Sequence, residues 1–290
     1  MTEGTDLIFV HLGISVTHMV KSFSLFGISF AYYGLIIGIG MIAGLLVAQS
    51  DAKRRGQNPE MYVDFMIYGI IFAILGARIY YVIFQWGYYK DHLSEIVNLR
   101  KGGLAIYGGI IASVITLLVF TKKRGISFLS MADSCCLGLV TGQIIGRWGN
   151  FVNCEAFGGY TDNLFAMRIK RSIVNESMIS QDVLDHLITE NGIQYIQVHP
   201  TFLYESLWNL GLLLFMLWYR KRKKFTGEML LIYLTGYGIG RAWIEGLRTD
   251  QLLIPGTSLA VSQLLSVALA VISVFVLLRC RRKAIGSKEE

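Results

Sequence analysis

The sequence predicts an all-α polytopic membrane protein with seven transmembrane helices, and three observations support this fold class. Of the 290 residues, 53% are hydrophobic, and the mean hydropathy is +0.50. Only 16% are charged, whereas soluble domains carry about 25%. Seven apolar stretches are long enough to cross a hydrocarbon core of roughly 30 Å, which takes about 20 helical residues. They lie near residues 23–48, 61–84, 103–120, 130–150, 200–218, 227–246 and 258–278.

Short basic clusters follow every second apolar stretch, at residues 53–55, 122–124, 220–224 and 279–283. Loops rich in lysine and arginine remain on the cytoplasmic side of a membrane. The clusters therefore predict an external N-terminus and a cytoplasmic C-terminus. The net charge of +7 indicates topology and attraction to anionic lipid headgroups, not binding to nucleic acid.

The chain reads as one integral-membrane domain over residues 1–290. The 22 residues before the first apolar stretch contain no basic region and no small-residue cleavage motif, so we expect a retained helix and not a removable signal peptide. Residues 155–199 form a long external segment between the fourth and fifth helices, with helical spacing over 182–189. Because loops of this length usually carry function, we expect a small extracytoplasmic head there.

Small residues recur four positions apart in several apolar stretches. The sets are Gly34/Gly38, Gly40/Gly44, Gly138/Gly142/Gly146 and Gly236/Gly240. This spacing lets membrane helices approach closely, so it predicts a tightly packed bundle.

The four cysteines, Cys135, Cys136, Cys154 and Cys280, show no metal-ligand spacing and no external pairing. We therefore expect packing roles, with no disulfide framework, metal site or cofactor.

Among the charged residues inside the apolar stretches, Arg78, Arg147, Arg241 and Glu245 require an explanation. Each ionised group at mid-bilayer costs about 2.5–3.5 kcal/mol. At a rise of 1.5 Å per residue, the predicted topology places the arginines about 21–25 Å above the cytoplasmic end of their helices. Structural salt bridging alone is one explanation, but it would not favour a single depth.

Polar residues of the downward helices reach the same depth. Tyr33, Tyr107 and the stretch His199 to Glu205 lie within roughly 15 Å of the outer ends of their helices. Polar groups from six helices thus share one layer, which predicts a site in the outer leaflet.

The helical phase gives two polar faces. Tyr237, Arg241, Glu245 and Arg248 lie within about 80° of one another on one helix. In the fourth helix, if it persists that far, Arg147 and Glu155 lie opposite the glycine side, with Asn150 at the edge. The glycine side, Gly138, Gly142, Gly146 and Gly149, can then pack against a neighbouring helix.

Arginines and asparagines at this depth favour a phosphate ester, because guanidinium groups bind phosphate oxygens bidentately. A phospholipid is the abundant phosphate ester of the bilayer. Glu155 and Glu245 would orient the arginines or handle a proton. This reasoning predicts action on phospholipid headgroups at the outer face, and it leaves transfer, hydrolysis and flipping open.

The stretch "GRWGNFVNCEAFG", residues 146–158, resembles the signature G-R-x-G-N-F-hydrophobic-N-x-E-x-x-G of the prolipoprotein diacylglyceryl transferases at every fixed position. The resemblance extends through "YYGLIIGIG", "LGARIYYVIF", "RKGGLAIYGGIIA", "HPTFLYE" and "GYGIGRAWIEGLR", in the family's order.

This resemblance implies transfer of the diacylglyceryl group of phosphatidylglycerol to the thiol of the lipobox cysteine in a preprolipoprotein. The products are a thioether and glycerol phosphate, in the first step of bacterial lipoprotein maturation. It also implies a multi-pass protein of the bacterial cytoplasmic membrane with seven helices and an extracytoplasmic head, which we expect to act as a monomer.

Carried over by motif, Arg147 and Arg241 resemble the phosphate-binding and catalytic arginines of the family. The supporting polar residues are Tyr33, Asn150, Glu155, Tyr237, Glu245 and Arg248. From their depth we add Arg78 and His199 to the predicted substrate-binding residues. Cys154 occupies a variable position of the signature, so the acceptor thiol should come from the substrate.

The sequence departs from the family at Tyr107, where "GGLAIYGG" replaces a segment in which many members have a histidine proposed as the base. A tyrosine, with a reference pKa near 10, is a poor base at neutral pH. Either Tyr107 only binds substrate, or another group takes the proton.

Three other classes of function are compatible with several apolar spans that contain polar residues. A retinal pump would need a lysine in the seventh span for a Schiff base, and residues 258–278 contain none. A flippase or solute transporter would spread polar groups through the membrane depth, whereas the lower halves of these spans are mostly apolar. A phospholipid hydrolase would need a water-activating dyad or a metal, and the sequence shows no such motif.

Overall fold

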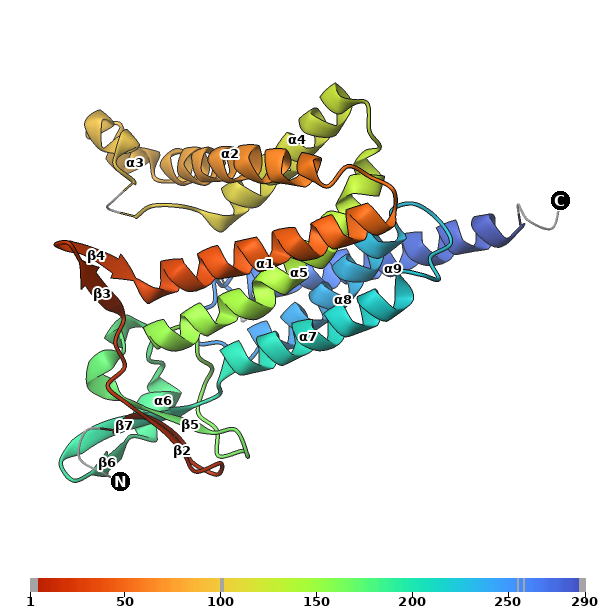
Figure 1. Ribbon diagram of the computed structural model, residues 1–290. Helices are drawn as coiled ribbons and strands as arrows, with labels where there is room; N and C mark the ends of the chain where they lie inside the picture. The colour runs from red at the N-terminus through yellow and green to blue at the C-terminus, as the bar shows by residue number, and fades with distance from the viewer. Residues whose placement is uncertain (1–4, 100–101, 255, 258, 287–290) are drawn as a thin grey trace. The chain divides into compact units, whose positions relative to one another are not determined.

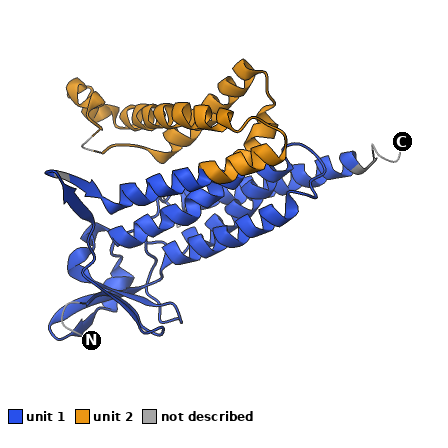
Figure 2. Ribbon diagram, viewed as in Figure 1, with its two compact units in different colours: residues 1–44, 136–290 blue, residues 45–135 orange. Residues whose placement is uncertain are grey.

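The computed structural model describes residues 5–99, 102–254, 256–257 and 259–286. The chain forms two compact units (Figure 2), which are taken one at a time below. Unit 1 comprises residues 1–44 and 136–290, and unit 2 comprises residues 45–135. Ser258, the predicted start of the seventh span, and Arg100 and Lys101 of the "RKGG" segment lie outside the described residues.

Long helices dominate both units (Figure 1). Their bounds are α1 Tyr32–Arg54, α2 Glu60–Phe84, α4 Ile106–Arg124, α5 Phe128–Asn153, α7 Thr201–Tyr219, α8 Glu228–Glu245 and α9 Val261–Gly286. Two short helices are α3 Trp86–Tyr89 and α6 Gln181–Asp185, and 3-10 turns are η1 Leu93–Val97, η3 Arg171–Ile173 and η4 Glu176–Met178.

Within the described residues, six helices are long and apolar enough to cross a membrane: α1, α2, α4, α5, α7 and α9. These findings show a multi-pass membrane protein. The stretch predicted as the sixth span forms the helix α8, but its 18 residues include Glu228, Arg241 and Glu245, and it is not among these six helices. It packs against both α7 and α9.

The first apolar stretch is only partly helical. Residues 22–31 form a hairpin of β3 (Ser22–Leu25) and β4 (Ile28–Ala31), and α1 begins at Tyr32. The predicted helix start near residue 23 is therefore wrong. Phe26 and Gly27 between the strands have φ of 50° and 78°, the left-handed conformation that a tight hairpin turn requires.

An antiparallel sheet in unit 1 also corrects the all-α prediction. Its order is β2-β1-β5-β7-β6, with bounds β1 Thr5–Phe9, β2 Ile14–Thr17, β5 Met167–Lys170, β6 Ile188–Glu190 and β7 Ile193–Val198. β1 pairs with β5 in the register Leu7↔Ile169. The segment after α5 therefore folds together with the N-terminal residues, which the sequence analysis did not anticipate.

Figure 1 shows the strands of this sheet beside α6. The sheet covers a small apolar core. Its fully buried members include Leu7, Ile169, Val183 and Ile196. Val183 comes from α6, which covers Gln181–Asp185 only. The helical spacing predicted over 182–189 thus ends early, because Ile188 begins strand β6 and pairs with Tyr195.

The predicted close packing of glycines is confirmed between α1 and α5 in unit 1. A Cβ on Gly44 would lie 2.5 Å from the Gly138 oxygen, and one on Gly40 would lie 3.1 Å from the Gly142 oxygen. Gly146 meets Ile37, and Gly149 meets the Tyr33 ring. Gly34 and Gly38 have no such neighbour within 4 Å, so only part of the small-residue pattern serves this contact.

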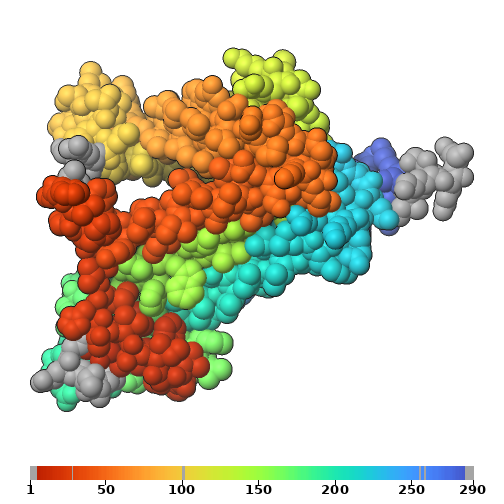
Figure 3. Space-filling model, viewed as in Figure 1, coloured from red at the N-terminus to blue at the C-terminus, as the bar shows by residue number. Residues whose placement is uncertain are grey.

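Large apolar side chains remain exposed along the helices. On α1 they include Leu35, Ile39, Ile42 and Leu46, and on α7 Leu207, Leu214 and Trp218. Parts of both helices form the molecular surface in Figure 3. Exposed apolar surface of this extent is typical of helices that face lipid.

Candidate active site

The signature stretch forms the end of α5 and the turn after it. Arg147 and Asn150 lie in the last two turns, and the helix ends at Asn153. Cys154 and Ala156 then adopt φ of 53° and 56°, which reverses the chain. Glu155 therefore does not lie on the helix, as the phase analysis assumed, but folds back so that its backbone N–H donates to the Asn150 carbonyl at 3.0 Å.

The carboxylate of Glu155 accepts hydrogen bonds from two asparagines of the signature. The distances are 2.9 Å from Asn150 Nδ2 and 3.4 Å from Asn153 Nδ2. Tyr33 of α1 lies nearby and interacts electrostatically with Arg147 and Glu155. Its ring rests against Gly149, so a side chain at that glycine would displace the tyrosine.

Glu205 of α7 joins the arginines of two helices. Its side chain is only 3% exposed. Arg147 Nη2 lies 2.5 Å from Glu205 Oε2, and Arg241 Nη1 lies 3.1 Å from Oε1. The structure thus brings together the two arginines that the sequence analysis selected, and it places between them a carboxylate that was quoted in "HPTFLYE" but not selected.

Arg241 lies between two carboxylates. Its other amino group, Nη2, lies 2.6 Å from Glu245 Oε2 one turn later on α8. Glu245 is 4% exposed and accepts a hydrogen bond from Ser262 Oγ of α9 at 2.5 Å. The spacing of four residues on one helix brings Arg241 and Glu245 together, as the phase analysis predicted.

Arg248 lies near Glu205 and Glu245 although it is not part of helix α8. The phase analysis put it on the helical stripe, but α8 ends at Glu245, so that placement is wrong. Arg248 Nη1 nevertheless lies 3.9 Å from Glu205, and its Nε lies 3.9 Å from Glu245. Asp250 holds it with two hydrogen bonds of 2.8 and 2.7 Å.

These six residues form what we call the arginine cluster: Arg147, Arg241, Arg248, Glu205, Glu245 and Asp250. Arg147 and Arg241 remain partly exposed, with side-chain exposures of 19% and 16%. Because a guanidinium has five N–H donors, and Glu205 is the one ion-pair partner of Arg147 among the described residues, donors remain available at the cluster for a further anion.

Burial and ion pairing shift two pKa values near the cluster. Burial of Asp250 acts to raise its pKa, but the hydrogen bonds and charge of Arg248 outweigh this and lower it below 3.8. Burial also lowers the pKa of His199 below 6.5, so this histidine is neutral at pH 7. Its Nδ1 lies 3.3 Å from the Tyr204 hydroxyl.

The last glycine of the signature, Gly158, lies where three segments cross. Its N–H donates to the His199 carbonyl at 3.0 Å, and it forms an isolated bridge with Arg248. A Cβ here would lie 2.7 Å from the Leu247 oxygen and 2.8 Å from the His199 Cβ. Only glycine fits this crossing, which ties the segments before α7 and after α8 to the signature.

Tyr237 lies one turn before Arg241 on α8. Its ring stacks on Tyr233 at 5.6 Å, and the Tyr233 hydroxyl accepts a hydrogen bond of 2.9 Å from Gln143 of α5. This aromatic pair continues the polar side of α8 below the arginine cluster.

Arg78 lies in unit 2 and has a different environment. Its side chain is 6% exposed. Nε donates to the Ile96 carbonyl, Nη1 to the Gly102 and Gly103 carbonyls, and Nη2 to the Glu95 and Asn98 carbonyls, at 2.6–3.3 Å. These five bonds match its five N–H groups, so no donor remains for a phosphate.

Tyr107 also belongs to unit 2, in the first turn of α4 and half-buried. The next residue, Gly108, packs against α2, since a Cβ there would lie 2.3 Å from the Gly76 oxygen. The two glycines before α4, Gly102 and Gly103, have φ of 80° and 75° and direct their carbonyls to Arg78. The "GGLAIYGG" segment is thus fixed at both ends within unit 2.

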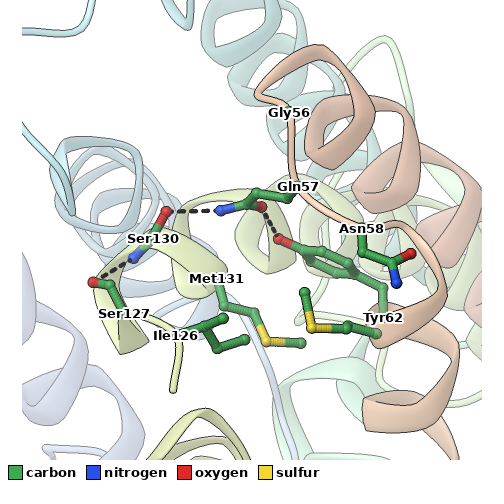
Figure 4. A pocket seen from close by; sticks show the side chains of 9 residues that line it. Gly56, Gln57, Asn58, Tyr62, Ile126, Ser127, Ser130 and Met131 are labelled. Atoms are coloured by element: carbon green, nitrogen blue, oxygen red, sulfur yellow. Dashed lines mark hydrogen bonds between the residues drawn. The ribbon is translucent and has the colours of Figure 1, made fainter. Parts of the chain in front are cut away.

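A cavity of about 330 Å³ lies elsewhere in unit 2 (Figure 4). Its polar lining is internally satisfied, because Gln57 donates to Ser130 Oγ at 2.7 Å and accepts from the Tyr62 hydroxyl at 2.5 Å. None of the residues that the sequence analysis selected lines it.

Burial raises the pKa of the Cys154 thiol to about 11. A buried, protonated thiol is a poor nucleophile, in agreement with an acceptor thiol supplied by the substrate. In the part of the chain that the structure describes, no three His, Cys, Asp or Glu side chains are grouped to hold a metal ion.

The sequence of this chain matches known proteins over most of its length. Residues 21–279 match the family model for prolipoprotein diacylglyceryl transferase. The chain belongs to this family. It is 42% identical over 269 residues to the phosphatidylglycerol–prolipoprotein diacylglyceryl transferase of Geobacillus kaustophilus, covering 93% of this chain and 90% of the relative.

Two further relatives carry the same name. The one from Finegoldia magna is 42% identical, covering 93% of this chain and 98% of the relative. The one from Clostridioides difficile is 42% identical over 80% of this chain and 84% of the relative. The signature residues lie at one end of α5 because they are contiguous in the sequence, whereas Glu205 and Asp250 were not selected by the sequence analysis. Glu205 could have been found as a charge within an apolar span.

Proposed function

We propose that this chain transfers the diacylglyceryl group of phosphatidylglycerol to the lipobox cysteine of a preprolipoprotein. The carbon–sulfur bond of a thioether forms, the bond between the glyceryl carbon and the phosphate oxygen breaks, and glycerol phosphate leaves. The arginine cluster carries this proposal, because it gathers three guanidinium groups among apolar helices. The names of the relatives support the choice of substrates.

Arg147 and Arg241 would bind the phosphate and stabilise the charge that develops on it. Cleavage of the carbon–oxygen bond adds a second negative charge to the departing phosphate, and one preorganised donor there is worth about 3–4 kcal/mol. Glu245, at 2.6 Å from Arg241, would orient that arginine. Glu155 with Asn150 would orient the lipid headgroup or relay the proton.

The remaining predicted residues would support binding. Tyr33 and Tyr237 lie on the α1 and α8 sides, and Arg248 and His199 lie on the segments that cross at Gly158. Arg78 has no free N–H, so we assign it to the support of the segment that leads to Tyr107. Tyr107 would contact substrate without serving as the essential base.

We further propose seven membrane spans, with α8 as the sixth. Its 18 residues give a length of about 27 Å, and its charged residues can face the protein interior between α7 and α9. Basic residues close α1, α4 and α9, which supports a cytoplasmic location for those ends. The site would then face the outer leaflet of the bacterial cytoplasmic membrane, in a monomer with its head outside.

The direct test is reconstitution of the purified protein in vesicles that contain phosphatidylglycerol, with a lipobox peptide as acceptor. Mass spectrometry should show a peptide heavier by one diacylglyceryl group, together with released glycerol phosphate. An unmodified peptide with lipid flipped between leaflets would favour a transporter. Lipid cleaved without peptide modification would favour a hydrolase.

A further inference from the structure

Glu205 stands out in the arginine cluster because it pairs with all three arginines. Arg147, Arg241 and Arg248 lie 2.5, 3.1 and 3.9 Å from its carboxylate oxygens. Arg241 Nη1 also lies 3.4 Å from the second oxygen. Three separate segments, α5, α8 and the residues after α8, therefore meet at one buried anion.

The carboxylates of the cluster differ in what else holds them. The carboxylate of Glu245 accepts a hydrogen bond from Ser262 Oγ, and its backbone carbonyl accepts one from Gln251 Nε2. Asp250 forms its ion pair with Arg248. For Glu205, the described residues provide arginine partners only, so its carboxylate competes directly with any other anion for these guanidinium groups.

The formal charges of the cluster cancel. Three arginines face three carboxylates, all in unit 1. A phosphate needs the same guanidinium donors that a carboxylate uses, since both bind through paired oxygens. An arriving phosphate therefore competes with the anion that already lies between Arg147 and Arg241.

We propose that Glu205 is the resident counter-ion of the phosphate site, a positioning residue that holds Arg147 and Arg241 together in the lipid-free site and competes with phosphate for them. This inference rests on the proposed function. The two guanidinium groups would repel each other without an anion between them, so Glu205 keeps them arranged for the substrate. After the transfer it returns to both arginines and so speeds the release of glycerol phosphate.

The test is inhibition of transfer by glycerol phosphate in reconstituted Glu205→Gln. Glutamine keeps the shape but removes the competing charge, so glycerol phosphate should inhibit at a concentration at least tenfold lower than for the wild type. The turnover rate should fall while the KM for phosphatidylglycerol stays equal or decreases. A merely structural role would instead weaken inhibition or raise KM.

Glu228→Gln is the matched control. Like Glu205, Glu228 is a buried glutamate that pairs with an arginine, since it lies 2.7 Å from Arg281. It belongs to α8, about 20 Å along the helix from Arg241. Glycerol phosphate should inhibit transfer by this variant at the same concentration as for the wild type. If glycerol phosphate inhibits Glu228→Gln at the same lowered concentration as Glu205→Gln, the loss of any buried negative charge explains the effect, and the proposal is overturned.

Glu205→Asp provides a second variant if Glu205→Gln proves unstable in detergent. The shorter side chain cannot reach both arginines equally, so inhibition should tighten by a smaller factor. Unchanged or weaker inhibition in folded Glu205 variants overturns the counter-ion role while leaving the transferase function intact. Absence of transfer in the wild type would instead overturn the proposed function.

Discussion

Arg78 and Arg147 are both arginines embedded in apolar helices, but their partners differ in kind. Arg78 donates all five N–H groups to backbone carbonyls of residues 95–103. Among the described residues, Arg147 pairs with one carboxylate, Glu205, which leaves N–H donors for a ligand. The first arrangement completes a local structure, whereas the second leaves binding capacity at the site. The cost of a charge in an apolar span therefore indicates importance but does not distinguish support from ligand binding.

Substitution of Arg147 should have the largest effect on activity. In Arg147→Ala, we expect transfer to fall by about 10²–10³-fold, because one preorganised donor to the developing charge is lost. Glu205 keeps its pairing with Arg241, so the thermal midpoint in detergent should change little. Transfer to a lipobox peptide in vesicles measures the first effect, and a wild-type rate in this variant would remove Arg147 from the site.

Substitution of Arg78 should have the opposite effects: the stability of the protein should fall, and substrate binding should not change. Arg78→Ala leaves five carbonyls without their donor, and hydrogen bonds to a charged group are worth about 1.5–3 kcal/mol each. Even with water replacing several of them, we expect a loss of about 3 kcal/mol in stability, seen as a lower thermal midpoint. Any folded Arg78→Ala protein should keep the wild-type KM for phosphatidylglycerol.

A matched Arg78→Lys variant sharpens the comparison. Lysine keeps the charge but cannot serve five carbonyls, so it should also be unstable. If Arg78→Lys were as stable as the wild type but bound phosphatidylglycerol weakly, Arg78 would belong with the ligand-binding arginines after all.

The sequence predicted the helices far better than the sheet, for physical reasons. Hydropathy and length determine a membrane helix locally, so α2 and α7 begin within one residue of their predicted starts. Strand β1 instead depends on pairing with β5, about 160 residues away. No local sequence pattern predicts which strand it pairs with. A short strand such as Thr5–Phe9 has no amphipathic signal that exceeds its neighbours.

The same distinction applies to the site. Arg241 and Glu245 were predicted together because helical spacing alone places them on one face. Glu205 was missed because its role depends on contact with α5 and α8, which sequence spacing does not show. Arg248 was assigned to the helix because the end of α8 at Glu245 could not be read from the phase.

Substitution of Tyr107 should have a smaller effect on activity than substitution of Arg147. A free thiol of pKa about 8.5 is already a few per cent thiolate at pH 7, so removal of its proton costs only about 2 kcal/mol at 1.36 kcal/mol per pKa unit. We therefore expect Tyr107→Phe to retain measurable transfer, within about tenfold of the wild type. Tyr107→His should be tolerated. Complete loss in a folded Tyr107→Phe protein would make this tyrosine essential.

The smallest effect concerns Asp250, which gives Arg248 the carboxylate partner that Arg78 lacks. Arg248 lowers the pKa of Asp250 below 3.8, so the ion pair contributes stability above that pH and loses it as the pH falls through the lower, folded-state pKa. Because the pair is partly exposed to solvent, we expect at most about 1 kcal/mol. Asp250→Asn should therefore lower the thermal midpoint slightly at pH 7, and the difference from the wild type should shrink as the pH falls below 3.8 through the folded-state pKa of Asp250. A difference that persists unchanged at a pH where Asp250 is protonated in the folded protein would mean that Asp250 acts through packing and not through its charge.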